Sequence, residues 1–184
     1  GLAEDSPAAR AISEIERAAQ RAAELCQHLL AYAGESVPRR EVIDLVGLVE
    51  ELSQLLAVSV SKQCQLQITH REPQLGVRAD NAQLQQVVMN LIVNASEALG
   101  SRGGTVGIST HHTNVNDDGS SVDTNLLQPL TPGRYAVLEV RDDGSGMTAA
   151  TRERMFDPFF STKFAGRGLG MASVLGIIGA HEGG

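Results

Sequence analysis

Two glycine-rich stretches bracket a short aromatic run, and they constrain the fold more than any other feature of the sequence. The first, Asp142–Gly146, follows a strand-like stretch, and the second, Gly166–Gly170, leads into an apolar helix. Glycines after a strand let the backbone approach a flat ring, and an acid at a strand end can accept a hydrogen bond from an exocyclic amine. Free amides at a helix start suit phosphates. Taken alone, the first stretch is equally a turn or a calcium-like loop. The second lacks the Gly-Lys-Ser/Thr ending of a Walker loop.

The helix expected from Asp80 to Leu99, with Asp80 as its N-cap, carries amide side chains where a solvated helix usually carries Lys and Glu. Its wide apolar face consists of Leu84, Val87, Val88, Leu91, Ile92, Ala95 and Leu99. A second line, within about 40° of one direction, consists of Gln83, Gln86, Asn90, Asn94 and Glu97. Asn is unfavourable inside a helix, but its carbonyl oxygen can ligate Mg²⁺. The alternative is a plain polar face.

Strand and helix patterns alternate through the rest of the chain. Strands are predicted at 41–44, 64–68, 77–79, 105–109 and 135–140, and helices at 45–58, 80–99, 147–155 and 168–180. Residues 114–132 are polar and predict a loop. This order predicts an α+β fold, a two-layer α/β sandwich with a mixed, mostly antiparallel sheet covered by helices on one face.

The N-terminal segment has the pattern of one long helix. Ser6 and Pro7 are a favourable helix start, and Gly34 a favourable end. Between them an a/d heptad stripe is formed by Ile12, Ile15, Ala19, Ala22, Cys26, Leu29 and Ala33. Such a stripe needs partner helices, in a bundle or in its own domain.

Composition limits the classes of function. The chain is 42% hydrophobic with a formal net charge of −7, which argues against a general nucleic-acid or membrane-surface binder. Cys26 and Cys64 have no metal or redox spacing, and either a pair or two single thiols is compatible with the sequence. No apolar run approaches the roughly 20 residues of a membrane span, and no signal peptide is visible. We therefore expect a cytoplasmic location, which leaves open a membrane-anchored parent protein.

Four motifs in a fixed order resemble the N, G1, F and G2 boxes of sensor histidine kinases, whose ATP-binding domain has the Bergerat-type nucleotide fold. They are Asn90-x-x-x-Asn94, Asp142-x-Gly144-x-Gly146, Phe156-Asp157-Pro158-Phe159-Phe160 and Gly166-x-Gly168-x-Gly170. The resemblance is nearest to nitrogen-regulation and PAS-linked hybrid kinases. It implies a catalytic ATP-binding domain over 36–184, with further strands beyond Gly184. Residues 1–35 then correspond to the second helix of a dimerisation and phosphoacceptor hairpin.

The same resemblance implies roles for individual residues, with ATP and Mg²⁺ as ligands. Asp142 would recognise the adenine amine, and Asn94 would bind the metal. Asn90 would lie beside the triphosphate, where ATP-hydrolysing relatives have a Glu, and this favours transfer over hydrolysis. Lys163 and Arg167 would neutralise the outer phosphates, with Asn90 and Lys163 as catalytic candidates. The full expected nucleotide-binding set is Asn90, Asn94, Asp142, Gly144, Gly146, Thr162, Lys163, Arg167, Gly168, Leu169 and Gly170.

Further expectations concern the lid and two departures from the family pattern. Residues 157–168 would form a mobile lid anchored by Phe159 and Phe160. Many of these kinases have a Lys where this chain has Glu97, which argues against a phosphate contact there. Arg167 replaces the frequent Thr or Gly between the last two glycines.

The implied reaction is transfer of the ATP γ-phosphoryl group to a histidine on the first hairpin helix, for relay to a response-regulator Asp. The implied partners are a receiver domain and a second copy of the chain through the N-terminal helix, with no nucleic acid and no direct membrane contact. His28 is a weaker acceptor candidate, because Leu29 follows it rather than an acid. Alternatives are a serine kinase of the same fold and a nucleotide-binding pseudokinase.

Overall fold

The computed structural model describes residues 39–59, 63–116, 130–162 and 168–184. The expected N-terminal helix and domain 1–35 lie outside these ranges. The elements are β1 (Glu41–Asp44), α2 (Leu45–Ser59), β2 (Cys64–His70), β3 (Gly76–Ala79), α3 (Asn81–Leu99), the 3₁₀ turn η1 (Gly100–Arg102), β4 (Gly104–Val115), β5 (Gly133–Asp142), α4 (Ala149–Arg154) and α5 (Gly170–Ala180). Within the described ranges, no helix has the length and apolar character needed to cross a bilayer.

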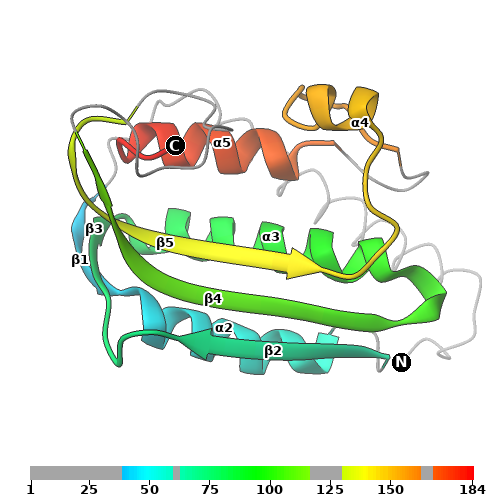
Figure 1. The fold of residues 1–184 in the computed structure, drawn as a ribbon, viewed down its shortest axis with the longest axis horizontal. Helices are drawn as coiled ribbons and strands as arrows, with labels where there is room; N and C mark the ends of the chain where they lie inside the picture. The colour runs from blue at the N-terminus through cyan, green and yellow to red at the C-terminus, as the bar shows by residue number, and fades with distance from the viewer. Residues whose placement is uncertain (1–38, 60–62, 117–129, 163–167) are drawn as a thin grey trace, which may run out of the picture.

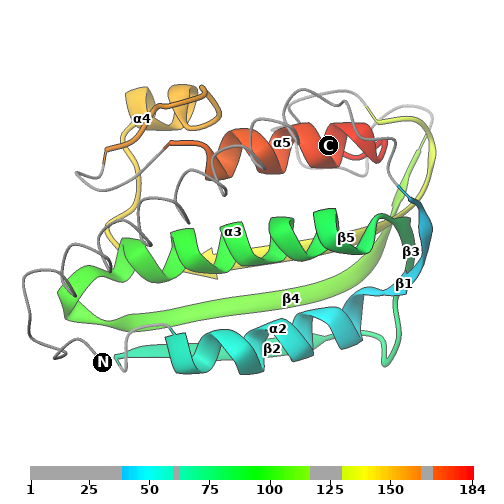
Figure 2. The same cartoon turned by 180° about the vertical axis from the view of Figure 1, so that it is seen from behind.

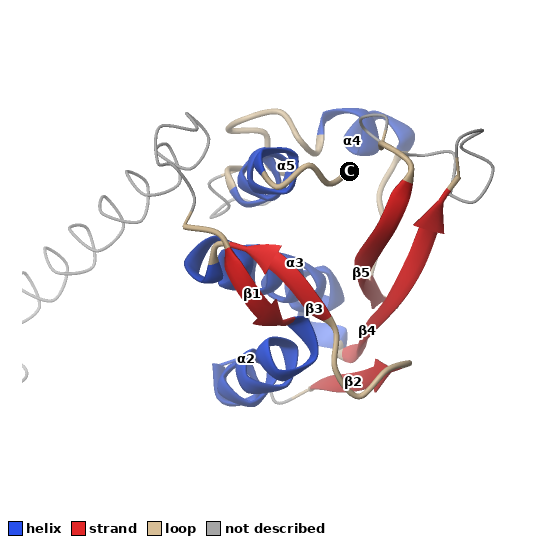
Figure 3. Cartoon of the chain, turned by 90° about the vertical axis from the view of Figure 1, so that its left-hand side faces the viewer, coloured by secondary structure: helices blue, strands red, loops and turns tan. Residues whose placement is uncertain are grey.

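The strands form a mixed arrangement. The larger sheet has the order β2-β4-β5, with β2 parallel and β5 antiparallel to β4, and β1 pairs antiparallel with β3. Figure 1 shows α3 behind β4 and β5, and the reverse view in Figure 2 shows α2 and α3 in front of them. In the end-on view of Figure 3, α2 and α3 lie on one side of the three-stranded sheet. The predicted α+β sandwich with helices on one face of a mixed sheet is therefore confirmed.

The main core lies between this sheet and the two helices α2 and α3. Val88 and Ile92 of α3 are fully buried there against Val106 and Ile108 of β4. Burying each such side chain stabilises the fold by about 1.5–3 kcal/mol. The predicted apolar face of α3 accordingly faces the sheet. A second cluster on the same helix, with Val87 as its buried member, packs against Val174 and Ile177 of α5.

The ends of the predicted elements lie within two residues of the observed ends, except at the C-terminal end of β4. Asp80 caps α3 as expected, since its side chain accepts a hydrogen bond from the Gln83 amide. The strand predicted at 105–109 extends to Val115, because its antiparallel pairing with β5 continues without a break from Val106↔Asp142 to Val115↔Gly133. The helix predicted from Gly168 begins at Gly170, because Gly168 has a φ of 64°, which a right-handed helix does not contain.

Candidate functional site

The loop after β5 is seated on the last turn of α3. The Ser145 amide donates a hydrogen bond to the Ala98 carbonyl oxygen at 3.1 Å. A Cβ at position 144 would lie 2.6 Å from both the carbonyl carbon and oxygen of Ala98, so only glycine fits this approach. The Gly144 amide donates to Asp142 Oδ1 at 2.9 Å, and the Asp142 side chain is exposed. The sequence analysis expected the glycines of this loop to let the backbone approach a flat ligand. In the structure, Gly144 lets the backbone approach α3.

Asp143, to which the sequence analysis gave no role, ties this loop to the start of β4. Its Oδ1 accepts from the Thr105 amide at 2.8 Å, and its own amide donates to the Thr105 carbonyl oxygen at 3.3 Å. Arg102 Nη2 donates to the Asp143 carbonyl oxygen at 3.2 Å. The signal for this tie was the Gly103-Gly104 pair before a strand, where bare backbone allows a close approach. Of the two adjacent acids, Asp143 thus bonds the loop to β4, and the Asp142 side chain is exposed to solvent without a bond to another element that the structure describes.

The two asparagines of α3 lie between this loop and the start of α5. Asn90 is half-buried, and its Nδ2 donates to the Gly170 carbonyl oxygen at 3.3 Å. It therefore ties the middle of α3 to the first residue of α5. Asn94 is also half-buried and lies one helical turn farther toward Ala98. Along α3, the order from one end of the site to the other is Gly170 with Asn90, then Asn94, then the Asp142 loop.

The aromatic run is joined to the start of α5 through its backbone. The Phe159 amide donates to the Gly168 carbonyl oxygen at 2.9 Å. Phe159 itself has a φ of 67° and a 65% exposed side chain, so its connection to the start of α5 is made by its backbone and not by its ring. Phe160 is half-buried, with the Arg154 guanidinium 4.3 Å from its ring centroid. Arg154 also pairs with Asp157 at 3.3 Å.

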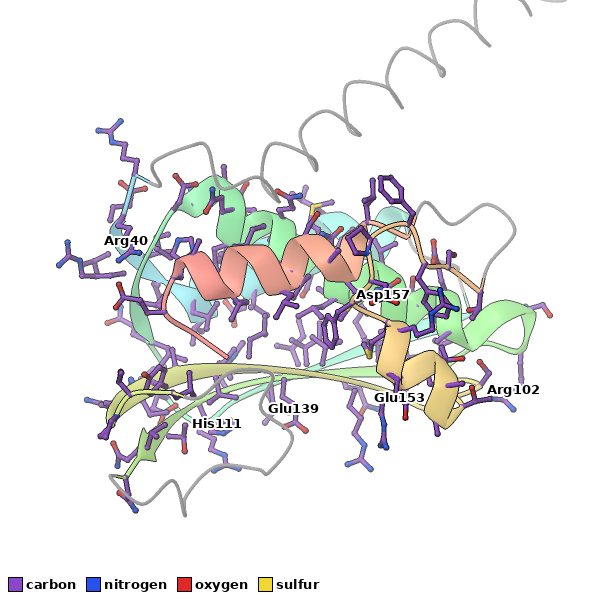
Figure 4. All side chains as sticks on the ribbon, turned by 90° about the horizontal axis from the view of Figure 1, so that it is seen from above. Arg40, Arg102, His111, Glu139, Glu153 and Asp157 are labelled. Carbon is purple, nitrogen blue, oxygen red and sulfur yellow. The ribbon has the colours of Figure 1, made fainter. Side chains whose placement is uncertain are left out.

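The remaining predicted residues are only partly described. Thr162 is exposed, Leu169 is buried, and Gly146 has a φ of 67° with open space around its Cβ position. Lys163 and Arg167, with the rest of the lid segment 163–167, lie outside the described residues. Figure 4 shows Asp157 near the start of α5 and Glu153 on α4.

The described residues offer few acidic, histidine or cysteine ligands for a cation at this site. In the described part of the chain, no three His, Cys, Asp or Glu side chains gather where they could hold a metal ion. A hard cation takes oxygen ligands, and phosphate oxygens with a neutral amide oxygen such as that of Asn94 satisfy this requirement. The first-turn amides of α5 are of the kind that bind phosphate groups.

Burial, with a further contribution from the Asp143 carboxylate, raises the pKa of the Cys64 thiol. Both effects disfavour the thiolate, so Cys64 should react slowly with iodoacetamide at neutral pH. Asp143→Asn removes only the second effect. In a Cys26→Ser background, we expect it to shift the labelling midpoint of Cys64 to lower pH, though not as far as that of a free cysteine. Mass spectrometry of the labelled peptide between about pH 7 and pH 10 measures this. An unchanged midpoint would contradict the placement of Asp143.

Comparison with known proteins identifies the family. Residues 79–184 match the family described as histidine kinase-, DNA gyrase B- and HSP90-like ATPases. The chain belongs to this ATPase family. It is 38% identical over 169 residues to the sensor kinase CckA of Brucella abortus, covering 91% of this chain and 17% of that protein. It is 29% identical over 167 residues to the sensory histidine kinase/phosphatase NtrB of Azospirillum brasilense, covering 90% of this chain and 40% of that one. The chain thus spans less than half the length of these relatives.

Solved histidine kinase structures share the fold of this ATPase family member. Full-length ShkA in complex with AMPPNP superposes with a TM-score of 0.69 at 20% identity, over 93% of this chain and 33% of that one. The catalytic domain of ThkA gives a TM-score of 0.61 at 24% identity, over 78% of this chain and 82% of that domain. ThkA in complex with the response regulator TrrA gives a TM-score of 0.66 at 22% identity, over 100% of this chain and 47% of that one.

Proposed function

We propose that this chain is the ATP-binding catalytic part of a sensor protein-histidine kinase. Its reaction would be transfer of the ATP γ-phosphoryl group to a histidine on a helix of the longer protein. The observation that carries the proposal is the convergence of three motifs on α3. The Asp142 loop is bonded to its last turn at Ala98, Gly170 is bonded to Asn90, and Asn94 lies between them. Membership of the ATPase family supports the same reading.

In this proposal each described residue has a separate role. The exposed Asp142 carboxylate, whose Oδ1 also accepts from the Gly144 amide, accepts a hydrogen bond from the adenine amine, while Asp143 holds the loop at Thr105. Asn94 offers a carbonyl oxygen to Mg²⁺, whose remaining ligands would be phosphate oxygens and water. The amides that open α5 receive the phosphates. Lys163 and Arg167 would supply the positive charge that phosphoryl transfer needs.

Asn90 supports transfer rather than hydrolysis. Its side chain is a neutral amide that donates to the Gly170 carbonyl oxygen at 3.3 Å. A neutral amide cannot remove a proton from water, so this position offers no general base. Asn90 then serves chiefly to keep the start of α5 against α3. Phosphoryl transfer depends mainly on positioning and charge stabilisation, which such a tie supports.

The expected partners follow from the relatives. One similar structure is a histidine kinase with a response regulator, and a receiver-domain Asp is the proposed final acceptor for this chain as well. We propose that residues 36–184 form the catalytic domain, and that residues 1–35 contribute a helix to a homodimeric bundle. A cytoplasmic location fits these roles.

We expect Asp142→Asn to weaken Mg-ADP binding by about 1.5–3 kcal/mol, or roughly ten- to hundredfold, because it removes a charged acceptor. The Asn carbonyl oxygen can still accept from the Gly144 amide, so the loop should keep its shape. Isothermal calorimetry measures the affinity. The matched control is Asp143→Asn, which keeps an acceptor for the Thr105 amide and should bind nucleotide like the wild type. Equal affinity of the Asp142 variant and wild type would exclude this adenine site.

The transfer step needs a second readout in the same experiment. The chain is incubated with radiolabelled Mg-ATP and a partner chain carrying the first hairpin helix. Acid-labile label on that partner, lost with Asp142→Asn, is the expected result. Acid-stable label would indicate serine as acceptor, binding without label would indicate a pseudokinase, and label on His28 would place the acceptor inside this chain.

A further inference from the structure

The segment that enters the described domain is bonded to the ends of two helices at once. The Arg39 amide donates to Asp80 Oδ2 at 3.0 Å, and Asp80 is the N-cap of α3. Arg40 Nη2 donates to the Ala180 carbonyl oxygen at 2.6 Å, where α5 ends, and Arg40 Nη1 pairs with Glu182 Oε1 at 3.1 Å. Residues 39 and 40 therefore contact the N-cap residue of one helix and the last turn of the other.

His181 completes this contact by joining the two helices directly. The Asp80 amide lies 3.0 Å from His181 Nε2, and His181 Nδ1 lies 2.8 Å from the Ile177 carbonyl oxygen. An amide can only donate and a carbonyl oxygen can only accept. Both bonds are made together only by the neutral ring with its proton on Nδ1. The imidazole thus links the N-terminus of α3 to the last turn of α5 in one defined tautomer.

Glu182 occupies a backbone conformation that favours glycine. Its φ is 62°, in the left-handed region that commonly ends a helix with Gly. A non-glycine residue there carries a conformational cost, and such residues gather where the surroundings or function require them. The Glu182 carboxylate pairs with Arg40, and this ion pair explains why a charged residue stands where glycine is favoured.

The two helices joined here also carry nucleotide motifs, at positions away from these contacts. Asn90 lies ten residues beyond Asp80 on α3, or about 15 Å along the axis. Gly170 and Ala180 are the two ends of α5, and Figure 4 shows Arg40 and Asp157 at opposite ends of this helix. Because helices move as nearly rigid rods, holding α3 and α5 together at His181 fixes how Asn90 meets Gly170.

We propose that Arg39, Arg40, Asp80, His181 and Glu182 form a junction that sets the mutual placement of α3 and α5 for nucleotide binding. In this junction His181 is a positioning residue, and Arg39 and Arg40 join it to the chain that precedes the domain. The inference rests on the proposed function, since it assigns a role toward the same nucleotide site. It adds that displacement of residues 39–40 changes nucleotide affinity, and that nucleotide binding stabilises the junction by the same factor.

The test compares Mg-ADP affinity of the 184-residue chain by calorimetry. His181→Ala is expected to weaken binding about five- to tenfold, the lower range for coupling between separate sites. His181→Gln, which restores an acceptor for the Asp80 amide, should recover most of the affinity. His112→Ala is the matched control, because His112 is half-buried on β4 and its bonding partners are Arg134 and Glu72, which belong to neither α3 nor α5. It should bind like the wild type.

Hydrogen exchange supplies the reciprocal measurement. Mg-ADP should slow exchange of the Asp80 amide in the wild type and have little effect on it in His181→Ala. Should His181→Ala not fold, Arg40→Ala at the surface replaces it, with a severalfold loss of affinity expected. Wild-type affinity in a folded His181→Ala or Arg40→Ala chain overturns the junction and leaves the proposed function intact. A wild-type chain that binds no Mg-ADP would instead remove the proposed function and this inference together.

Discussion

Gly144→Ala is expected to lower the free energy of unfolding by about 3 kcal/mol and to abolish detectable Mg-ADP binding. The added methyl would lie 2.6 Å from the backbone carbon and oxygen of Ala98 and 2.7 Å from Asp142 Oδ1. Backbone atoms in a helix cannot yield as the end of a flexible side chain can. The loop must therefore lift from α3, which breaks the bond from the Ser145 amide and displaces Asp142.

Gly146→Ala is the matched control for this prediction. Gly146 has a φ of 67°, but nothing lies within 4 Å of its Cβ position, so the change adds only backbone strain of about 1 kcal/mol. Urea unfolding of the two variants and calorimetry with Mg-ADP give the comparison. If both variants lost the same stability, conformational freedom rather than close approach would explain Gly144.

Gly168→Ala should destabilise the chain by about 3 kcal/mol or more, since two penalties act together. Its φ is 64°, and a Cβ would lie 2.4 Å from the Phe159 carbonyl carbon and 2.6 Å from the Phe160 amide nitrogen. The hydrogen bond from the Phe159 amide to the Gly168 carbonyl oxygen should be lost. Residues 156–160 would then separate from the start of α5, and their amides should exchange faster.

Gly170→Ala tests whether this effect belongs to position 168 or to any glycine of the motif. A Cβ at position 170 would lie 3.6 Å from Asn90 Oδ1, an ordinary contact, and the residue has begun the helix. Alanine is the better helix former by up to about 1 kcal/mol, so stability should be unchanged or slightly higher. Circular dichroism during thermal unfolding measures both variants. A loss at Gly170 equal to that at Gly168 would contradict the steric argument.

The fold was predictable where local pattern and burial agree. The apolar face of α3, its Asp80 cap and the strand before Asp142 follow from residue periodicity and capping chemistry, and the structure has them. The length of β4 was underestimated, because the polar run His111–Asn114 interrupts the alternation of apolar and polar residues, while the strand is extended by its pairing with β5, which leaves no local pattern. Local patterns identify an element more readily than its ends.

Tertiary contacts between distant backbone groups were not predictable in the same way. Asp143 resembles its neighbour Asp142 in sequence, and only the Thr105 amide distinguishes the two. His181 binds the amide of Asp80, 101 residues earlier. A backbone amide leaves no sign in the residue types, so the sequence does not identify either partner, although Gly103-Gly104 marks a close approach of the backbone near Thr105. The nucleotide motifs were found because their residue types are themselves required by the chemistry.

The parallel pairing of β2 with β4 has a consequence for the order of folding. Cys64 pairs with Gly104 and His70 with Thr110, so residues 71–103, including all of α3, lie between the paired segments. A hairpin can close from its turn, but this ladder must first bring together residues 40 positions apart, and closing such a loop costs entropy before any contact forms. Packing of the apolar face of α3 onto β4 reduces this entropy cost, because it brings β2 and β4 closer before they pair. The helix that carries Asn90 and Asn94 is therefore expected to be structured in the folding transition state, with high φ-values at Val88 and Ile92.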